Sequence, residues 1–285
     1  MVRFEPITGR YIYLTIQNIE YRVYYEESGQ GIPLICQHSA GSLGVEWRHM
    51  LNDAAITSKY RVIVADLPYH GRSVPPESVE WWKQEYKLTK SFFMDFQIEL
   101  SRALGLERPV YIGTAAGGFL ALDLAQEHPD KFRAVIGINS AICGGPATLD
   151  TFYHPYIGND YKRANALYFS APTNPIKYRR AISWVSMLGA PPVMKGDLYY
   201  YFKEHDLNGK TATIDTSRCA VYLLTGEYDP TSSVEDTKIL AKQIKGAVFT
   251  EMKGMSHAGM AENPELFKKY LMPILDKIEK QPQKN

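Results

Sequence analysis

The stretch Val110-Tyr-Ile-Gly-Thr-Ala-Ala-Gly-Gly-Phe119 combines three structural signals in a short space. Pro109–Ile112 is an apolar run that predicts a buried strand, and a helical pattern of apolar residues begins at Phe119. The residues between them are small, as a sharp turn requires when it brings a helix close to the strand before it. The stretch therefore predicts a strand, a tight turn and a helix in direct succession.

Further apolar runs bounded by turn residues occur along the chain. They are Ile32–Cys36, Arg61–Ala65, Ala134–Ile138, Ala220–Leu224 and a weaker run, Ala247–Met252. Continuous apolar runs of this length are typical of strands buried on both faces of a parallel sheet. Amphipathic helical patterns separate several of the runs, around residues 93–104, 119–124 and 265–280. This alternation predicts an α/β fold with a doubly wound, mostly parallel sheet.

Two segments depart from this alternation. Residues 12–16 and 19–25 alternate between apolar and polar, which predicts a half-buried antiparallel pair that turns at Gln17-Asn18. Residues 141–215 show no strand–helix alternation and are rich in Tyr, Pro and Gly. Because a structureless loop of that length is improbable, we interpret it as an inserted, mainly helical cap. Residues 1–140 and 216–285 would then form the core domain.

The composition excludes several classes of protein. The chain has 285 residues, 45% of them hydrophobic, and its 32 Lys and Arg balance 31 Asp and Glu to a charge of +1. A near-neutral chain has no bulk attraction for nucleic acid or a membrane surface, and we expect neither as a partner. The three cysteines and the apolar-poor N-terminus suggest no disulfide framework and no signal peptide, so we expect a cytoplasmic protein.

Four more motifs follow the ends of predicted strands. They are Gln37-His38-Ser39-Ala40-Gly41, Asp66-Leu-Pro-Tyr-His-Gly-Arg-Ser73, Leu224-Thr-Gly-Glu-Tyr-Asp229-Pro230 and Gly254-Met-Ser-His257-Ala258. With these four motifs and the stretch at 110–119, the chain resembles the α/β-hydrolase superfamily over nearly its whole length. In that family a G-x-S-x-G nucleophile elbow is followed by an acid and then a histidine, which is the order found here. The competing interpretation of residues 110–119 is a phosphate-binding turn, but neither G-x-G-x-x-G nor a P-loop Lys-Ser/Thr pair is present.

The resemblance implies a role for each motif. His257 is the candidate general base, and Asp229 would orient it, with Glu227 as the alternative acid. The backbone amides of Ala40 and Ala116 would form an oxyanion hole. His38 and Ser39, in the same turn as Ala40, are candidate substrate contacts. The chain departs from the family at Ser39 and Tyr69, where glycine is usual.

The largest departure is Ala115, which occupies the position of the nucleophile. Serine is the residue expected there, because a methyl group cannot attack a carbonyl carbon. An aspartate nucleophile fits less well, since the elbow that carries it resembles G-x-D-W and the next residue here is Ala116. Either the chain is a nucleophile variant of a serine hydrolase, or it is a natural binding protein that has lost catalysis. The intact His257 and Asp229 favour the first account.

The tyrosine-rich insertion suggests a fairly large, apolar or aromatic small-molecule substrate. Tyr161 and Trp184 are the candidate contacts in it. The leading hypothesis is hydrolysis of a carboxylic ester or a lactone. Hydrolysis of a C–C bond or an amide remains open, as does a non-catalytic small-molecule receptor and a homo-oligomeric state. The sequence contains no metal-ligand motif, and triad chemistry requires no cofactor.

Overall fold

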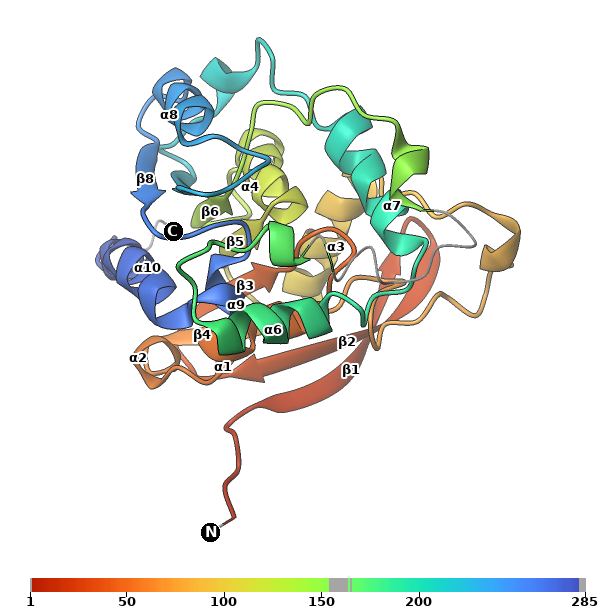
Figure 1. Cartoon of the computed structure of the whole chain (residues 1–285). Helices are drawn as coiled ribbons and strands as arrows, with labels where there is room; N and C mark the ends of the chain where they lie inside the picture. The colour runs from red at the N-terminus through yellow and green to blue at the C-terminus, as the bar shows by residue number, and fades with distance from the viewer. Residues whose placement is uncertain (1, 154–163, 165, 282–285) are drawn as a thin grey trace.

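The computed structural model describes residues 2–153, 164 and 166–281 and contains one eight-stranded sheet (Figure 1). The strand order is β1-β2-β4-β3-β5-β6-β7-β8. The strands are β1 (Thr8–Ile16), β2 (Ile19–Ser28), β3 (Ile32–Gln37), β4 (Tyr60–Ala65), β5 (Val110–Thr114), β6 (Ala134–Ile138), β7 (Ala220–Gly226) and β8 (Val248–Met252). From β4 to β8 every neighbouring pair is parallel, whereas β2 pairs antiparallel with both β1 and β4. The predicted doubly wound sheet is confirmed.

The first two strands form the predicted hairpin. Gln17 and Asn18 connect them with positive φ angles of 50° and 65°. Two successive positive φ values are typical of the tight turns that match the twist of antiparallel strands, and asparagine tolerates them well. The pairing runs from Ile16 opposite Ile19 to Thr8 opposite Glu27. This hairpin extends the sheet beyond its parallel part.

Helices cover both faces of the sheet. The helices α3 (Lys90–Ala103), α4 (Ala116–Glu127) and α8 (Val234–Gln243) pack on one face. The helices α1 (Arg48–Leu51), α2 (Ala54–Thr57), α9 (Gly259–Glu262) and α10 (Pro264–Glu279) pack on the other. The sheet is therefore the middle of three layers, as its apolar strands require.

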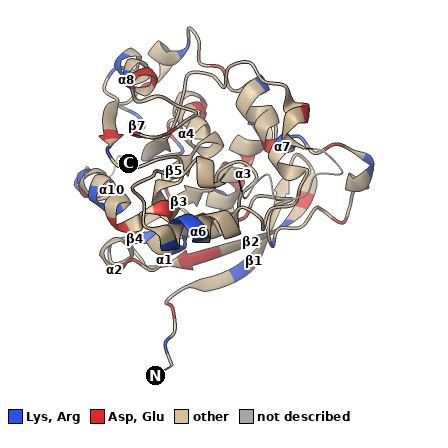
Figure 2. Cartoon of the chain, in the orientation of Figure 1, with Lys and Arg blue, Asp and Glu red and all other residues tan. Residues whose placement is uncertain are grey.

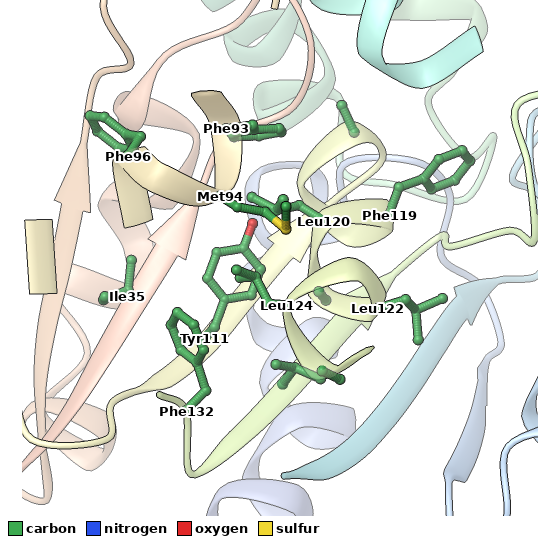
Figure 3. Close-up of a cluster of buried hydrophobic side chains, with 14 of the residues drawn as sticks. Ile35, Phe93, Met94, Phe96, Tyr111, Phe119, Leu120, Leu122, Leu124 and Phe132 are labelled. Carbon is green, nitrogen blue, oxygen red and sulfur yellow. The ribbon is translucent and has the colours of Figure 1, made fainter. Parts of the chain in front are cut away.

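The alternation of side chains along the central strands builds two separate cores. On β5, Tyr111 points to the face that α3 and α4 cover, and Val110 and Ile112 point to the opposite face. Figure 3 shows Tyr111 among Phe93 of α3, Leu124 of α4 and their neighbours. Burial on both faces holds the ends of the parallel strands firmly, and the loops that follow those ends carry the motifs of interest.

The segment between β6 and β7 is helical in its described part. It contains η3 (Leu149–Phe152), α6 (Ile176–Val185), α7 (Val193–Tyr199), the π-helical turn η4 (Tyr200–Glu204) and η5 (Thr211–Thr213). Its only β interaction among the described residues is the isolated bridge between Cys143 and Asp206. Residues 141–215 of this connection are the insertion defined above. In Figure 1, α6 (green) lies in the foreground below the label of β3, and α7 (teal) lies to the right, near the label of α3.

Charged residues of both signs are scattered over the helices (Figure 2). Within the described residues, no helix combines the length and apolar character needed to cross a membrane.

Candidate active site

Ala115 lies at the sharp turn between β5 and α4. Its backbone angles are φ 51° and ψ −115°, a conformation that non-glycine residues rarely adopt. The glycines around it permit the turn because they have no Cβ atom to clash with the neighbouring backbone. A Cβ atom at Gly113 would lie 2.4 Å from the carbonyl oxygen of Gly117, and one at Gly118 would lie 2.2 Å from that of Ile138. The close strand–helix approach expected of a nucleophile elbow is therefore present.

His257 and Asp229 face each other beyond the elbow. Nδ1 of His257 lies 2.6 Å from Oδ2 of Asp229, and the aspartate side chain is fully buried. Oδ1 of the same carboxylate accepts hydrogen bonds from the Thr231 hydroxyl (2.7 Å) and from the amides of Thr231 and Ser232. The alternative acid, Glu227, is exposed and accepts a bond from the Gly254 amide instead. The structure thus brings Asp229, and not Glu227, to the histidine.

The environment of this pair favours a charged imidazolium. Burial alone would lower the pKa of His257, but Asp229, with smaller contributions from Glu262 and Glu46, raises it above its usual value. Burial would likewise raise the pKa of Asp229, and the facing His257 lowers it instead. The pair therefore supports a carboxylate that stabilises positive charge on the ring.

The backbone of His257 is also held in place. Its carbonyl oxygen accepts hydrogen bonds from the Asn139 amide group (2.8 Å) and from the Thr114 hydroxyl (3.1 Å). Its ring lies 5.2 Å, centroid to centroid, from the ring of Phe169. No partner of Nε2 is found among the described residues. The ring edge that carries Nε2 is thus available to a ligand.

Ala115 and His257 line one cavity of about 540 Å³. Ser39 and Ala40, from the turn after β3, line it as well. Most of its remaining wall comes from the insertion. The lining residues of the insertion are Gly144, Phe152, Ala166, Tyr168, Phe169, Ile182, Ser186, Met194, Leu198, Tyr201 and Phe202. A cavity of this size suits a small-molecule ligand.

The turn after β3 is fixed by two carboxylates. Glu46 accepts bonds from the amide (3.0 Å) and the hydroxyl (2.7 Å) of Ser39, and Asp197 of α7 accepts one from the amide of Gly41 (2.7 Å). Between them, the amide of Ala40 has no acceptor in the described part of the chain. The amide of Ala116 has none within α4, because the first amides of a helix lack intrahelical partners. Ser39, which stands where glycine is usual in the family, stabilises this turn through the bond from its hydroxyl to Glu46.

Two expected substrate contacts require correction. His38 is buried behind the turn, where its Nδ1 bonds to the Ser39 carbonyl oxygen (2.9 Å) and its Nε2 accepts from the Leu67 amide (3.2 Å). Both ring nitrogens are occupied, so His38 supports the turn and does not line the cavity. Trp184 is 68% exposed. Ile182, Ser183 and Val185 form the buried face of α6, and Trp184 points away from that face.

Tyr161, the third expected contact, lies outside the described residues. Other residues at the cavity or in contact with His257 escaped prediction, including Glu46, Glu262 and Asn139. Asn139 directly follows β6, and a polar residue at the carboxyl end of a central strand is a usable signal. The two glutamates carry no such signal, because each lies in a short helix whose orientation depends on the fold. No group of three or more His, Cys, Asp or Glu side chains in the described ranges is arranged to hold a metal ion.

Comparisons with known proteins agree on the fold. A family model described as the alpha/beta hydrolase fold matches residues 32–184. Epoxide hydrolase 4 of Mus musculus is 25% identical over 294 residues, which cover 92% of this chain and 78% of that protein. A thermophilic esterase from Thermogutta terrifontis superposes with a TM-score of 0.81 at 18% identity, over 95% of this chain and 99% of the esterase. The enol-lactonase from Burkholderia xenovorans gives a TM-score of 0.77 at 19% identity, over 93% of this chain and the whole lactonase chain.

Proposed function

Because this chain belongs to the α/β hydrolase fold family, we propose that its cavity is the active site of a Ser-His-Asp hydrolase with Ala115 at the nucleophile position. The observation that carries the proposal is the pair of His257 and Asp229, 2.6 Å apart, beside the strained turn at Ala115. A histidine oriented by a buried carboxylate, on the wall of a cavity that also contains such a turn, is the arrangement of a general base.

The proposed reaction is acyl transfer. With a serine at position 115, Nε2 of His257 would accept the hydroxyl proton while the oxygen attacks the carbonyl carbon of the substrate. Asp229 would stabilise the imidazolium formed, and the amides of Ala40 and Ala116 would donate to the oxyanion. Each such donor contributes about 2.7–4 kcal/mol where it has been measured. As the tetrahedral intermediate collapses, His257 would give its proton to the leaving alcohol oxygen, which departs and leaves an acyl-serine. Neutral His257 would then take a proton from water, which attacks the acyl-serine, and would return it to the serine oxygen as the acid is released.

The substrate class we propose is a carboxylic ester or lactone of a fairly large, apolar or aromatic small molecule. The support is the aromatic wall that the insertion contributes to the cavity. We propose that residues 141–215 act as a cap over a core formed by residues 1–140 and 216–285. Similar folds include both an esterase and an enol-lactonase by name. Hydrolysis of a C–C bond or an amide would use the same groups.

A second candidate function is a small-molecule receptor. It is favoured by the methyl side chain of Ala115, which offers no attacking atom to a carbonyl carbon. On this account the cavity binds a ligand and leaves it intact.

Restoring the nucleophile distinguishes the two. We expect the chain with Ala115 to be nearly inert and Ala115→Ser to hydrolyse p-nitrophenyl butyrate, because losing a serine nucleophile costs about 10⁶-fold in kcat in a well-studied protease. Ala166→Ser is the matched control, since it adds a hydroxyl elsewhere on the cavity wall. Equal rates for the three proteins would refute the assignment of position 115 and favour the receptor.

A further inference from the structure

Two carboxyl groups outside the histidine–aspartate pair line the cavity. Glu46 belongs to η1 (Gly44–Trp47) and Glu262 ends α9, and these two short helices contact each other. Their side chains are 3% and 1% exposed, respectively. Both are close enough to His257 to raise its pKa. The cavity therefore has an acidic region next to its histidine.

The hydrogen bonds of Glu46 come from neutral groups. Both of its carboxylate oxygens bond to Ser39, one to the amide and one to the hydroxyl. Arg48 lies near enough to interact with it electrostatically, but Nη1 of the guanidinium donates to the Val45 carbonyl oxygen. Arg48 is not among the residues that line the cavity. The charge of Glu46 is thus solvated by dipoles and not cancelled by an ion pair.

The hydrogen bonds of Glu262 also come from neutral groups. Its oxygens accept bonds from the Ala258 amide (3.1 Å), from the Asn174 side chain (2.6 Å) and from the Ala171 amide (3.4 Å). Burial raises the pKa of this carboxyl to about 7. A buried acid supported by neutral donors gains further from a nearby positive charge, since Coulomb attraction is strong away from water.

The lining contains no opposing cation among the residues that the structure describes. Neither lysine nor arginine occurs in it, and its basic side chain, His257, already pairs with Asp229. Neither glutamate forms an ion pair of its own within those ranges. Aromatic rings supply much of the remaining wall: Phe152, Tyr168, Phe169, Tyr201 and Phe202. Aromatic faces attract ammonium groups through their negative quadrupole. The acidic region and the rings therefore favour the same kind of ligand.

We propose that the cavity selects an acyl compound that carries a protonated amine or a quaternary ammonium group, which faces Glu46 and Glu262. An anionic ligand would add like charge to the acidic region and is disfavoured. The cavity itself, and not the acidic pair alone, defines the site. The inference rests on the proposed function for the reaction, and it adds the charge of the substrate.

The test compares three ligands of similar size that differ in charge. They are butyrylcholine, its neutral isostere 3,3-dimethylbutyl butyrate, and the anionic monobutyl succinate. Calorimetric titration uses the chain with Ala115, which we expect to leave the esters uncleaved, at pH 8, which lies above the pKa of about 7 of Glu262. We expect butyrylcholine to bind about tenfold more tightly than the neutral ester, within the range of buried cation–π contacts. The anion should bind most weakly.

Variants locate the effect. Glu46→Gln and Glu262→Gln should each reduce the preference for the cation, and the double variant should abolish it. Glu265→Gln is the matched control, because Glu265 is exposed in the first turn of α10. The comparison of ligands on the unchanged protein needs no variant, so it remains decisive even where a substitution prevents folding. Equal binding of cation and neutral ester, or tighter binding of the anion, would overturn the inference.

A parallel measurement separates this inference from the proposed function. Hydrolysis of the same three esters is followed with Ala115→Ser. Turnover without a preference for the cation would refute the charge selection and leave the hydrolase proposal standing. A preference in binding without turnover would refute the hydrolase proposal and support the ligand class.

Discussion

Ala115 has the strained backbone expected at the nucleophile position that we propose, although its side chain has no reactive atom. A non-glycine residue at φ 51° costs about 1–3 kcal/mol, and such strain persists only where the surroundings enforce it. The surroundings do so here, because the Ala115 amide donates to the Ile138 carbonyl oxygen (3.0 Å) and its carbonyl oxygen accepts from the Phe119 amide (2.8 Å). A serine at this position would inherit the same backbone, which is why Ala115→Ser is an informative change.

The pH dependence of the restored enzyme should report His257. A general base acts in its neutral form, so kcat/KM of Ala115→Ser should rise with pH through a midpoint above 6.5, the usual value for histidine. Adding Asp229→Asn removes the main group that raises this pKa. We expect the midpoint to move to lower pH and kcat to fall about 10⁴-fold. Rates measured from pH 5 to 9 with p-nitrophenyl butyrate test both effects.

Two further variants in the Ala115→Ser background complete that experiment. His257→Ala should be as damaging as loss of the nucleophile, because the members of a triad act as one unit. Glu227→Gln should leave both rate and midpoint nearly unchanged, since its carboxylate bonds to the Gly254 amide and not to His257. If Glu227→Gln were more harmful than Asp229→Asn, the acid would have to be reassigned.

The sequence predicts the pair of His257 and Asp229 better than it predicts the residues packed around that pair. Motif order and the residue types suffice to select His257 and Asp229, because covalent chain order constrains which strand ends carry them. The distinction between a histidine that lines a cavity and one that supports a turn depends on packing. His38 is the example, since its two ring nitrogens are occupied by backbone groups from different loops.

At the scale of elements, α7 connects the insertion to the turn after β3. Asp197 of this helix is 1% exposed and accepts bonds from the Gly41 amide, from Nε2 of His70 (2.8 Å) and from the Tyr86 hydroxyl (3.0 Å). Nδ1 of His70 lies 2.9 Å from the Pro68 carbonyl oxygen, so both ring nitrogens face acceptors. The buried ion pair thus joins three segments around the proposed oxyanion turn.

The charge state of this pair makes stability depend on pH. Burial would lower the pKa of His70, but Asp197, with help from Pro68 and Asp66, raises it. The neighbouring His38, 4.8 Å away between ring centroids, has a pKa lowered by burial and by His70. Because the folded pKa of His70 lies above its unfolded value, its contribution is complete below about pH 6.5 and is lost as pH rises through the folded value.

We therefore predict that Asp197→Asn destabilises the fold by about 3–5 kcal/mol, the usual effect of removing one partner of a buried pair. The decline of stability with rising pH that His70 contributes should also disappear. Urea unfolding at pH 6 and pH 9 measures both. Asp150→Asn is the control, because Asp150 is 83% exposed and forms a surface ion pair with Lys195 of α7, the helix that also carries Asp197. An Asp197→Asn variant as stable as the control would show that this pair does not hold α7.

Elements with a strong periodic pattern were predictable. The six strands from β3 to β8 follow the apolar runs closely, because burial on both faces leaves little room for polar residues. The sequence pattern did not predict α8, α1 or α2. The last two have four residues each, too few to show helical periodicity. Such short helices are held by tertiary contacts, which a sequence pattern does not record.

At the scale of the whole molecule, the cavity belongs to neither part of the chain alone. Ala115 and His257 come from loops at the ends of the central strands, while the aromatic wall comes from the insertion. The sequence predicted aromatic density in that segment but could not predict which rings face inward. Tyr200 donates to Asp123 of α4 (2.6 Å) and is fully buried, whereas its neighbour Tyr201 lines the cavity. Adjacent residues on a helix point in different directions, so composition alone cannot separate them.

Because the aromatic wall of the cavity comes from the insertion, we expect the insertion to determine which substrates are accepted. In the Ala115→Ser background, Phe202→Ala should lower kcat/KM for a bulky aromatic ester by about tenfold or more and affect a short acetyl ester little, because Phe202 lines the cavity. Trp184→Ala is the matched control, since it removes a larger ring from the exposed side of α6. It should leave the ratio of the two kcat/KM values unchanged. Competition between the two esters measures that ratio directly. A change of the ratio in Trp184→Ala, with none in Phe202→Ala, would mean that the ligand contacts the outer face of the insertion and not the cavity.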